Sequence, residues 1–176
     1  MKKILAFAGS NSSTSINKEL LEYTINKIPN SVSLIDLIDF EAPMYSIDQE
    51  NDKGIPENII KLSQKIRNTD VLIITVNEHN GSASAFFKNH IDWLSRHDRN
   101  FLKNTKVALL STSPGRGGAK MALKWAAEVL PRFGAEIICE FSLASFNHAY
   151  SKEKGIFDPD QKQVFDAAIK QLSAHI

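Results

Sequence analysis

Residues 71–76 read VLIITV, an unbroken apolar run made almost entirely of β-branched side chains. A run of this length without polar alternation is typical of a strand buried on both faces, as at the centre of a parallel sheet. The residues that follow, 77–84 (NEHNGSAS), are polar and include a glycine, which indicates a loop. The stretch therefore predicts a central strand whose carboxyl end opens into a polar loop.

Short apolar runs and amphipathic stretches alternate on both sides of this strand, which is the pattern of consecutive βαβ units. The polar stretch from residue 40 to residue 54 is too irregular to predict an element, and its length makes it a candidate functional segment. Further strands are predicted at residues 4–8, 32–38, 107–110 and 137–143, and helices at residues 16–28, 56–66, 86–94, 121–130 and 158–172.

This alternation predicts an α/β protein, because right-handed crossovers between parallel strands leave few other topologies. We expect a flavodoxin-like three-layer sandwich around a five-stranded parallel sheet with strand order 2-1-3-4-5. No internal repeat, linker or low-complexity segment divides the sequence, and its length suits one hydrophobic core. We therefore expect residues 1–176 to form a single domain.

The last predicted helix has the clearest start in the sequence. Asp158 is placed as its N-cap, Pro159 takes the first helical position, and Gln161 is placed to complete a capping box. Apolar residues at helical spacing are expected to face the sheet, namely Val164, Phe165, Ala168, Ile169 and Leu172.

The composition is that of an ordinary globular protein, with 43% hydrophobic residues, 23% charged residues and a net charge of +1. So small a charge disfavours nucleic acid as a partner and favours a small molecule. The first residues carry too few apolar side chains for a signal peptide or a membrane span. The single cysteine, Cys139, lies in an apolar run and is expected to be a buried, unreactive thiol. We expect a cytoplasmic protein without a membrane partner.

The loop at residues 9–17 (GSNSSTSIN) is the strongest candidate for a binding site. Its hydroxyl groups come directly before a predicted helix, where free backbone N–H groups and the positive end of the helix dipole attract a phosphate. The alternative is that Ser15 is simply a helix cap. The loop lacks the lysine of a P-loop and the G-x-G-x-x-G spacing of dinucleotide sites, so a mononucleotide phosphate suits it better.

Two more polar loops are expected beside it, because ligands of such sheets bind beyond the carboxyl ends of the strands at the switch point. The loop at residues 111–118 (STSPGRGG) has glycines that would let the backbone approach a flat ligand, or that simply form a flexible turn. In the loop at residues 77–84, Glu78 and His79 stand side by side without the spaced ligands that a metal requires. We expect neither a metal site nor a catalytic side chain.

Taken together, the three loops resemble those of the NAD(P)H-dependent FMN reductases, a family that includes quinone, azo-dye and chromate reductases. Residues 9–17 are similar to the family's phosphate loop, G-S-x-R-x-x-S-x-N. Residues 78–82 followed by 87–96 (FKNHIDWLSR) resemble P-E-Y-N-G-S and L-K-N-x-I-D-W, the more specific signal. Ser113, Gly115 and Gly118 are similar to the turn S-x-G-x-x-G-G. The resemblance covers nearly the whole chain.

This resemblance implies an FMN cofactor that NADPH or NADH reduces, a small acceptor such as a quinone or free flavin, and a homodimer or homotetramer. The phosphate would lie on the first loop and the flavin ring between the second and third. The residues implied to bind the cofactor are Ser10, Ser15, Ile16, Asn17, Asn77, Glu78, His79, Asn80, Gly81, Ser82, Ser113, Gly115 and Gly118.

The chain departs from the family pattern at two places. Ser12 replaces the arginine of the phosphate loop, which removes a bidentate partner for phosphate, so we expect weaker FMN binding. Asn77 and His79 replace the proline and tyrosine of the second loop, so His79 is the residue that would stack in place of the missing aromatic ring.

Two other functions were weighed from the sequence. An FMN-binding electron carrier without its own nicotinamide reaction is disfavoured by the near-neutral charge, because flavodoxins are strongly acidic. A serine hydrolase would need His79, His90 or His148 as its base and is disfavoured because no G-x-S-x-G elbow is present.

Overall fold

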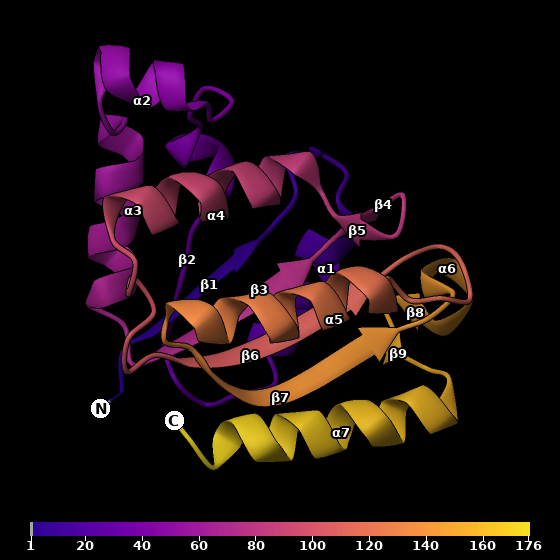
Figure 1. The fold of residues 1–176 in the computed structure, drawn as a ribbon. Helices are drawn as coiled ribbons and strands as arrows, with labels where there is room; N and C mark the ends of the chain where they lie inside the picture. The colour runs from indigo at the N-terminus through magenta and orange to yellow at the C-terminus, as the bar shows by residue number, and fades with distance from the viewer. Residues whose placement is uncertain (1) are drawn as a thin grey trace.

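The computed structural model describes residues 2–176 and contains a central sheet of five parallel strands (Figure 1). The strands are β1 (Ile4–Ala8), β2 (Val32–Leu34), β3 (Val71–Val76), β6 (Lys106–Thr112) and β7 (Glu136–Leu143). Their order in the sheet is β2-β1-β3-β6-β7, which confirms the predicted order 2-1-3-4-5. Each residue of β3 is buried, as its apolar run predicts for a central strand.

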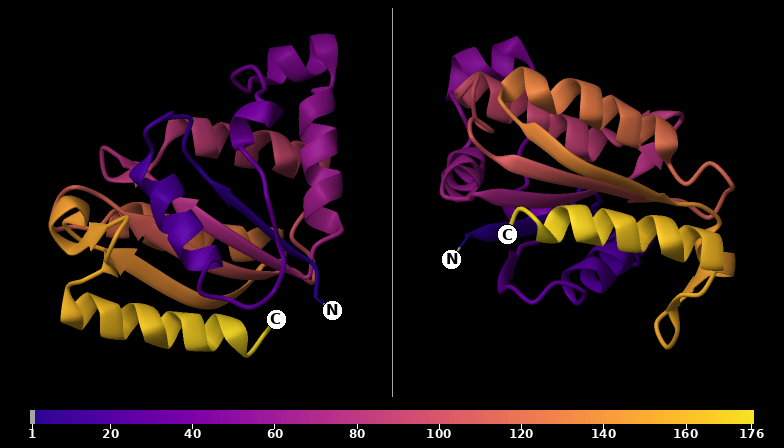
Figure 2. Two further views of the ribbon diagram at one scale, coloured as in Figure 1. Left: turned by 180° about the vertical axis from the view of Figure 1, so that it is seen from behind. Right: turned by 90° about the horizontal axis from the view of Figure 1, so that it is seen from below.

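Helices cover both faces of the sheet and produce three layers (Figure 2). The helices α1 (Ile16–Ile25) and α7 (Pro159–Ser173) pack on one face, and α3 (Glu57–Arg67), α4 (Ala85–His97) and α5 (Lys120–Val129) pack on the other. Successive residues of β1 alternate between the two cores: Leu5 belongs to the α3–α5 side, and Ile4 and Ala6 belong to the α1–α7 side. Two apolar cores therefore fix the sheet between the helical layers.

Most of the segment at residues 86–96, which resembles the family sequence, serves the fold. Trp93 is fully buried and its indole N–H donates to the carbonyl oxygen of Pro43 at 2.7 Å. Lys88 and Asp92 form the expected i,i+4 ion pair at 2.6 Å on the exposed side of α4. The side-chain amide of Asn89 also holds the segment before α2, accepting from the N–H of Tyr45 at 2.8 Å.

The segment between β2 and α3 contains elements that the sequence analysis did not predict. Strand β2 ends at Leu34 rather than residue 38, and the 3-10 helix η1 (Leu37–Phe40) follows it, capped by Asp36. Helix α2 (Ile47–Lys53) forms inside the stretch that looked irregular, with Ser46 as its N-cap. None of its residues is buried, so the sequence had no apolar stripe to reveal it.

Short hairpins are the other elements that the prediction missed. Strands β4 (Glu78–His79) and β5 (Ser82–Ala83) pair within the second loop, and β8 (Tyr150–Ser151) pairs with β9 (Gly155–Ile156) after the short helix α6 (Phe146–Ala149). The 3-10 helix η2 (Leu130–Phe133) follows α5 and ends at Gly134, which has a positive φ angle of 99°. No helix between residues 2 and 176 is long and apolar enough to cross a membrane.

Two details of α7 differ from the prediction. Asp158 caps the helix by accepting from the N–H of Gln161 at 2.9 Å, but the side chain of Gln161 does not complete a capping box. Its Oε1 accepts from the N–H of Ala144 at 2.7 Å, so it fastens α7 to the end of β7 instead. Val164 is 58% exposed rather than facing the sheet, because it lies outside the stripe that Phe165, Ala168 and Leu172 bury.

The single cysteine lies in β7, as an unreactive residue would. Cys139 is buried, and this burial raises the pKa of its thiol to about 11. Since the thiolate is the reactive form, a neutral thiol at this depth is inert toward oxidants and alkylating reagents. The predicted burial of the cysteine is confirmed, and its low reactivity stays a prediction that this burial supports.

Candidate functional site

The three predicted loops meet at the carboxyl ends of β1, β3 and β6 and enclose an open cleft of about 370 Å³. This volume lies within the range of ligand sites in proteins. The cleft faces the switch point of the sheet, where the chain reverses its direction of winding after β1. It is lined by Ser10, Ser12, Thr14, Ser15, Ile16, Asn17, Asn77, Glu78, His79, Thr112, Ser113 and Pro114.

The cleft unites part of the predicted set of site residues and leaves part of it outside. The predicted residues that line it are Ser10, Ser15, Ile16, Asn17, Asn77, Glu78, His79 and Ser113, and those that do not are Asn80, Gly81, Ser82, Gly115 and Gly118. Sequence reasoning missed Thr14, Thr112 and Pro114 as lining residues. Their position in the sequence could have revealed them, since each is directly next to a predicted site residue at a strand end or helix start.

The first loop presents hydroxyl groups at the N-terminus of α1. Ser15 is the N-cap of this helix and accepts from the N–H of Lys18 at 3.3 Å, so the capping role holds for this residue. Ser10 and Ser12 also accept backbone N–H groups, from Ser12 and Thr14 respectively, each at 3.3 Å. A hydroxyl that accepts in this way keeps its own proton free to donate. The loop therefore offers O–H donors and the positive end of a helix dipole to an anion.

Asn17 joins the first loop to the third. Its Oδ1 accepts from the N–H of Thr112 at 3.1 Å, and its Nδ2 donates to the carbonyl oxygen of Thr112 at 3.1 Å. Its own carbonyl oxygen accepts from the Thr75 hydroxyl at 3.0 Å. Since β6 extends one residue beyond its last pairing with β3, the amide of Asn17 takes the place that another strand residue would fill. Both polar atoms of the Asn17 side chain therefore bind the protein backbone and stabilise the fold.

Glu78 caps the N-terminus of α5. Its Oε2 accepts from the N–H of Met121 at 2.9 Å and from the N–H of Ala122 at 3.1 Å. This replaces the missing cap of the helix, because Ala119 at the N-cap position has no side-chain oxygen. A carboxylate at this end is also favoured by the helix dipole. Glu78 therefore holds the β4–β5 hairpin against α5.

We expect Glu78→Ala to lower the free energy of unfolding by about 1–2 kcal/mol, because two N–H groups of α5 lose their acceptor. Glu78→Gln keeps an acceptor oxygen without the charge and should lose less than half as much. Urea denaturation of both variants measures the difference. Glu128→Ala, at an exposed position near the other end of α5, is the control and should change stability little. An alanine variant as stable as the wild type would contradict the capping role.

The hairpin tip is a two-residue turn formed by Asn80 and Gly81. Both residues have positive φ angles, 52° and 75°, as a type I′ turn requires. Among the described residues, neither backbone N–H donates a hydrogen bond. The Asn-Gly pair is the strongest local signal for such a hairpin, so the sequence contained the information needed to predict it.

Gly118 is the glycine of the third loop that packs most closely against the rest of the protein. Gly118 is buried with φ of 61°, and a Cβ atom there would lie 2.3 Å from the hydroxyl oxygen of Ser142. Its role is close packing against β7.

In the second loop, Asn77 is 9% exposed, and its Oδ1 has no hydrogen-bond partner within the described residues. A buried amide oxygen without a partner is rare in folded proteins.

A family model described as NADPH-dependent FMN reductase matches residues 2–149. The chain belongs to this family. NAD(P)H-dependent FMN reductase of Pseudomonas aeruginosa is 27% identical over 97% of this chain and 92% of its own length. A quinone reductase of Escherichia coli is 35% identical over 46% of this chain and 43% of its own. The flavoenzyme NAD(P)H:(acceptor) oxidoreductase FerB of Paracoccus denitrificans shares the fold, with a TM-score of 0.75 and 24% identity over 99% of both chains.

Membership in the FMN reductase family makes the chain a flavin-dependent NAD(P)H oxidoreductase, with FMN as its cofactor and a nicotinamide as its reductant. The resemblance drawn from the three loops is thereby confirmed. The residues of the cleft fit an FMN molecule chemically: hydroxyl donors stand at a helix start, and the Oε2 of the one carboxylate that lines the cleft, Glu78, accepts from N–H groups of α5.

We expect Ser12→Arg to tighten FMN binding about tenfold, because a guanidinium at this position would add charge-assisted hydrogen bonds to the phosphate. Ser12 is exposed and lines the cleft, so the longer side chain has room. Quenching of flavin fluorescence on titration measures the affinity. Ser13→Arg is the matched control, since Ser13 is exposed in the same loop but does not line the cleft. Equal tightening by both variants would show only a general effect of charge.

Proposed function

We propose that this FMN reductase passes reducing equivalents from NAD(P)H to a small, flat acceptor, a quinone or free flavin, by a ping-pong cycle. The observation that carries the proposal is the single open cleft at the switch point. Because the cleft is open to solvent, nicotinamide and acceptor would occupy the same position in turn over the flavin ring. Relatives named as FMN reductase and quinone reductase support these two acceptor classes.

FMN, when bound, supplies the acceptance and release of hydride; the residues of the chain position it and tune it. In this proposal the phosphate lies at the start of α1, where the hydroxyls of Ser12 and Thr14 and the backbone N–H groups donate to it. Asn17 contributes its backbone N–H, since its side chain binds Thr112. The β4–β5 hairpin and the Ser113–Pro114 segment would hold the ring between them, next to Asn77.

The hairpin tip is the part of the chain that would steady negative charge on the flavin. The free N–H groups of Asn80 and Gly81 are fixed by the type I′ turn and lie beside residues of the cleft wall. Oriented amides of this kind stabilise an anion without rearranging. His79, which precedes the turn and lines the cleft, is exposed and takes the position where a flat acceptor would stack.

We further propose that the enzyme is a cytoplasmic homodimer or homotetramer in which the segment at residues 40–54 covers the cleft of a neighbouring subunit. This segment projects from the body of the protein with α2 at its tip (Figure 1). It carries two exposed apolar side chains, Met44 at 69% and Ile47 at 52% exposure. Apolar residues on a projecting segment favour contact with another molecule.

The proposal is tested by mixing the FMN-loaded protein with NADPH or NADH without oxygen. The yellow colour of bound flavin should disappear before any acceptor is added, and a quinone or free flavin should restore it. Steady-state plots at several acceptor concentrations should then give parallel lines. If the flavin stays yellow with an excess of both nicotinamides, the protein is an FMN-binding electron carrier instead of a reductase. If the steady-state lines intersect, nicotinamide and acceptor do not occupy the same position in turn.

A further inference from the structure

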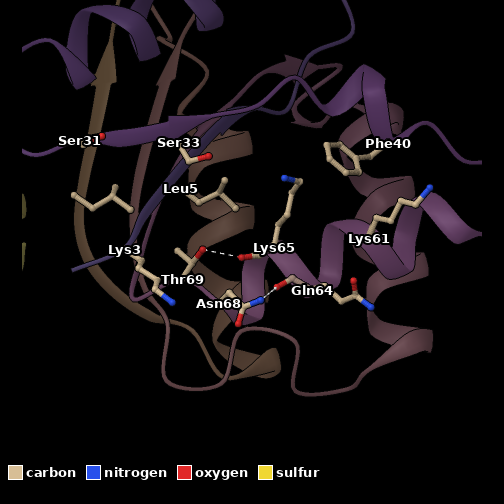
Figure 3. Close-up of a pocket in the computed structure, with 11 residues that line it drawn as sticks. Lys3, Leu5, Ser31, Ser33, Phe40, Lys61, Gln64, Lys65, Asn68 and Thr69 are labelled. Atoms are coloured by element: carbon tan, nitrogen blue, oxygen red, sulfur yellow. Dashed lines mark hydrogen bonds between the residues drawn. The ribbon is translucent and has the colours of Figure 1, made fainter. Parts of the chain in front are cut away.

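A second concave surface lies at the opposite end of the sheet from the flavin cleft. It is a groove of about 640 Å³ between the starts of β1 and β2 on one side and the C-terminal half of α3 on the other (Figure 3). Leu5 lines the groove and Ser10 lines the cleft, and β1 joins them, so the two sites are roughly 16 Å apart at ~3.3 Å per residue. No residue lines both.

The groove exists because nothing covers this side of β2. The strand has three residues at the edge of the sheet, and α3 packs against η1 and α4 instead of extending over it. The apolar floor that remains is formed by Leu5 and Phe40, which are 3% and 8% exposed. A buried apolar floor of this kind suits a flat aromatic group.

Positive charge surrounds this floor without an opposing carboxylate in the lining. Lys3, Lys61 and Lys65 line the groove, and Figure 3 shows the ammonium group of Lys65 between Ser33 and Phe40. Lys61 pairs with Glu57 at 2.7 Å, whereas neither Lys3 nor Lys65 has an ion-pair partner among residues 2–176. In a protein whose net charge is +1, two unpaired ammonium groups beside an apolar wall make a local anion-attracting field.

Some neutral polar groups in the groove already donate hydrogen bonds within the protein, and others do not. The Thr69 hydroxyl donates to the carbonyl oxygen of Lys65 at 2.8 Å, and the Asn68 amide donates to that of Gln64 at 2.9 Å, so these groups serve α3 (Figure 3). The hydroxyl of Ser33, on β2, makes no hydrogen bond within the described residues. It stands opposite Lys65 and can donate to the same anion.

From these observations we propose that the groove is a second ligand site, which binds a small aromatic anion carrying a carboxylate, sulfonate or phosphate. Lys65 and Ser33 bind the anionic group, Lys3 adds positive charge at the end of the groove beside Thr69, and the aromatic body lies on Leu5 and Phe40. The site does not depend on the flavin reaction, because it shares no residue with the cleft. Binding leaves the flavin cleft free.

The test uses anilinonaphthalene sulfonate, a fluorescent aromatic anion, with the FMN-loaded protein. The double variant Lys3→Gln and Lys65→Gln should weaken its binding at least about tenfold, because the charge-assisted contact of Lys65 and the nearby positive charge of Lys3 are both lost. The control Lys124→Gln and Lys170→Gln removes the same charge from exposed positions on α5 and α7 and should change affinity less than about twofold. Equal affinity in the wild type and the groove variant, or equal loss in both variants, would overturn the proposal.

Nuclear magnetic resonance locates the bound probe. Amide signals of residues 3–5, 31–33 and 61–69 should shift on titration, while those of residues 10–17 and 77–79 should not. Shifts confined to the second group would place the probe in the flavin cleft and would also overturn the proposal. Reduction of bound FMN by NADPH is measured separately on the groove variant. Loss of probe binding therefore reports on the second site, and loss of FMN reduction reports on the flavin function.

Discussion

Asn17→Leu is expected to lower the free energy of unfolding by about 4 kcal/mol and to weaken FMN binding by more than about tenfold. The leucine leaves the N–H and the carbonyl oxygen of Thr112 buried without partners, and each unsatisfied group costs about 1–3 kcal/mol. Thr112 is 2% exposed, so water does not replace the lost amide. Because Thr112 and Ser113 line the cleft, the displaced backbone also disturbs the flavin site.

Urea denaturation and flavin fluorescence titration measure the two effects. The matched control is Asn26→Leu, which places the same substitution at the C-cap of the same helix, on an exposed side chain without a hydrogen bond. The control should change stability by less than about 0.5 kcal/mol. If Asn17→Leu were as stable as Asn26→Leu, Asn17 would not support the end of β6.

The central sheet could be predicted from the sequence because its strands are chemically one-sided or fully apolar. The run at residues 71–76 lies buried in the middle, and its neighbours alternate with helices whose apolar stripes are regular. Helix α2 could not be predicted in this way, since it buries none of its residues and is held by Ser46 at its start. Local capping, which leaves only a weak trace in sequence, decides such short elements.

The location of the candidate site could be predicted from the sequence, but the function of each residue in it could be predicted less well. Chain topology brings the ends of β1, β3 and β6 together, so most residues of the three loops had to meet. The roles of Asn17 and Glu78 depend on long-range contacts, 95 residues away for Asn17 and 43 for Glu78. The family resemblance implied phosphate and ring contacts for them, whereas the structure uses their side-chain polar atoms to hold backbone at strand and helix ends.

The position of Gly118 shows the same distinction between proximity to a ligand and support of the fold. From the sequence, the glycines of the third loop are expected either to allow close approach of a flat ligand or to form a flexible turn. In the structure, the Gly118 carbonyl oxygen accepts from the hydroxyls of Ser111 and Ser142, each at 2.8 Å, and the residue does not line the cleft. It fixes the loop that carries Ser113 against β7, and its contribution to FMN binding is indirect.

Gly118→Ala is therefore expected to lower the free energy of unfolding by about 3 kcal/mol or more. The added Cβ would lie 2.3 Å from the Ser142 hydroxyl oxygen and 3.1 Å from the backbone nitrogen of Ala144, so either β7 or the loop must move. The φ angle of 61° adds further strain for a residue with a side chain. Gly117→Ala is the control: its Cβ would meet nothing within 4 Å and its φ is not positive. Alanine there should leave stability unchanged or raise it by up to about 1 kcal/mol. Urea denaturation of the two variants separates a glycine required by packing from one that only makes the loop flexible, and equal stability would refute the packing role.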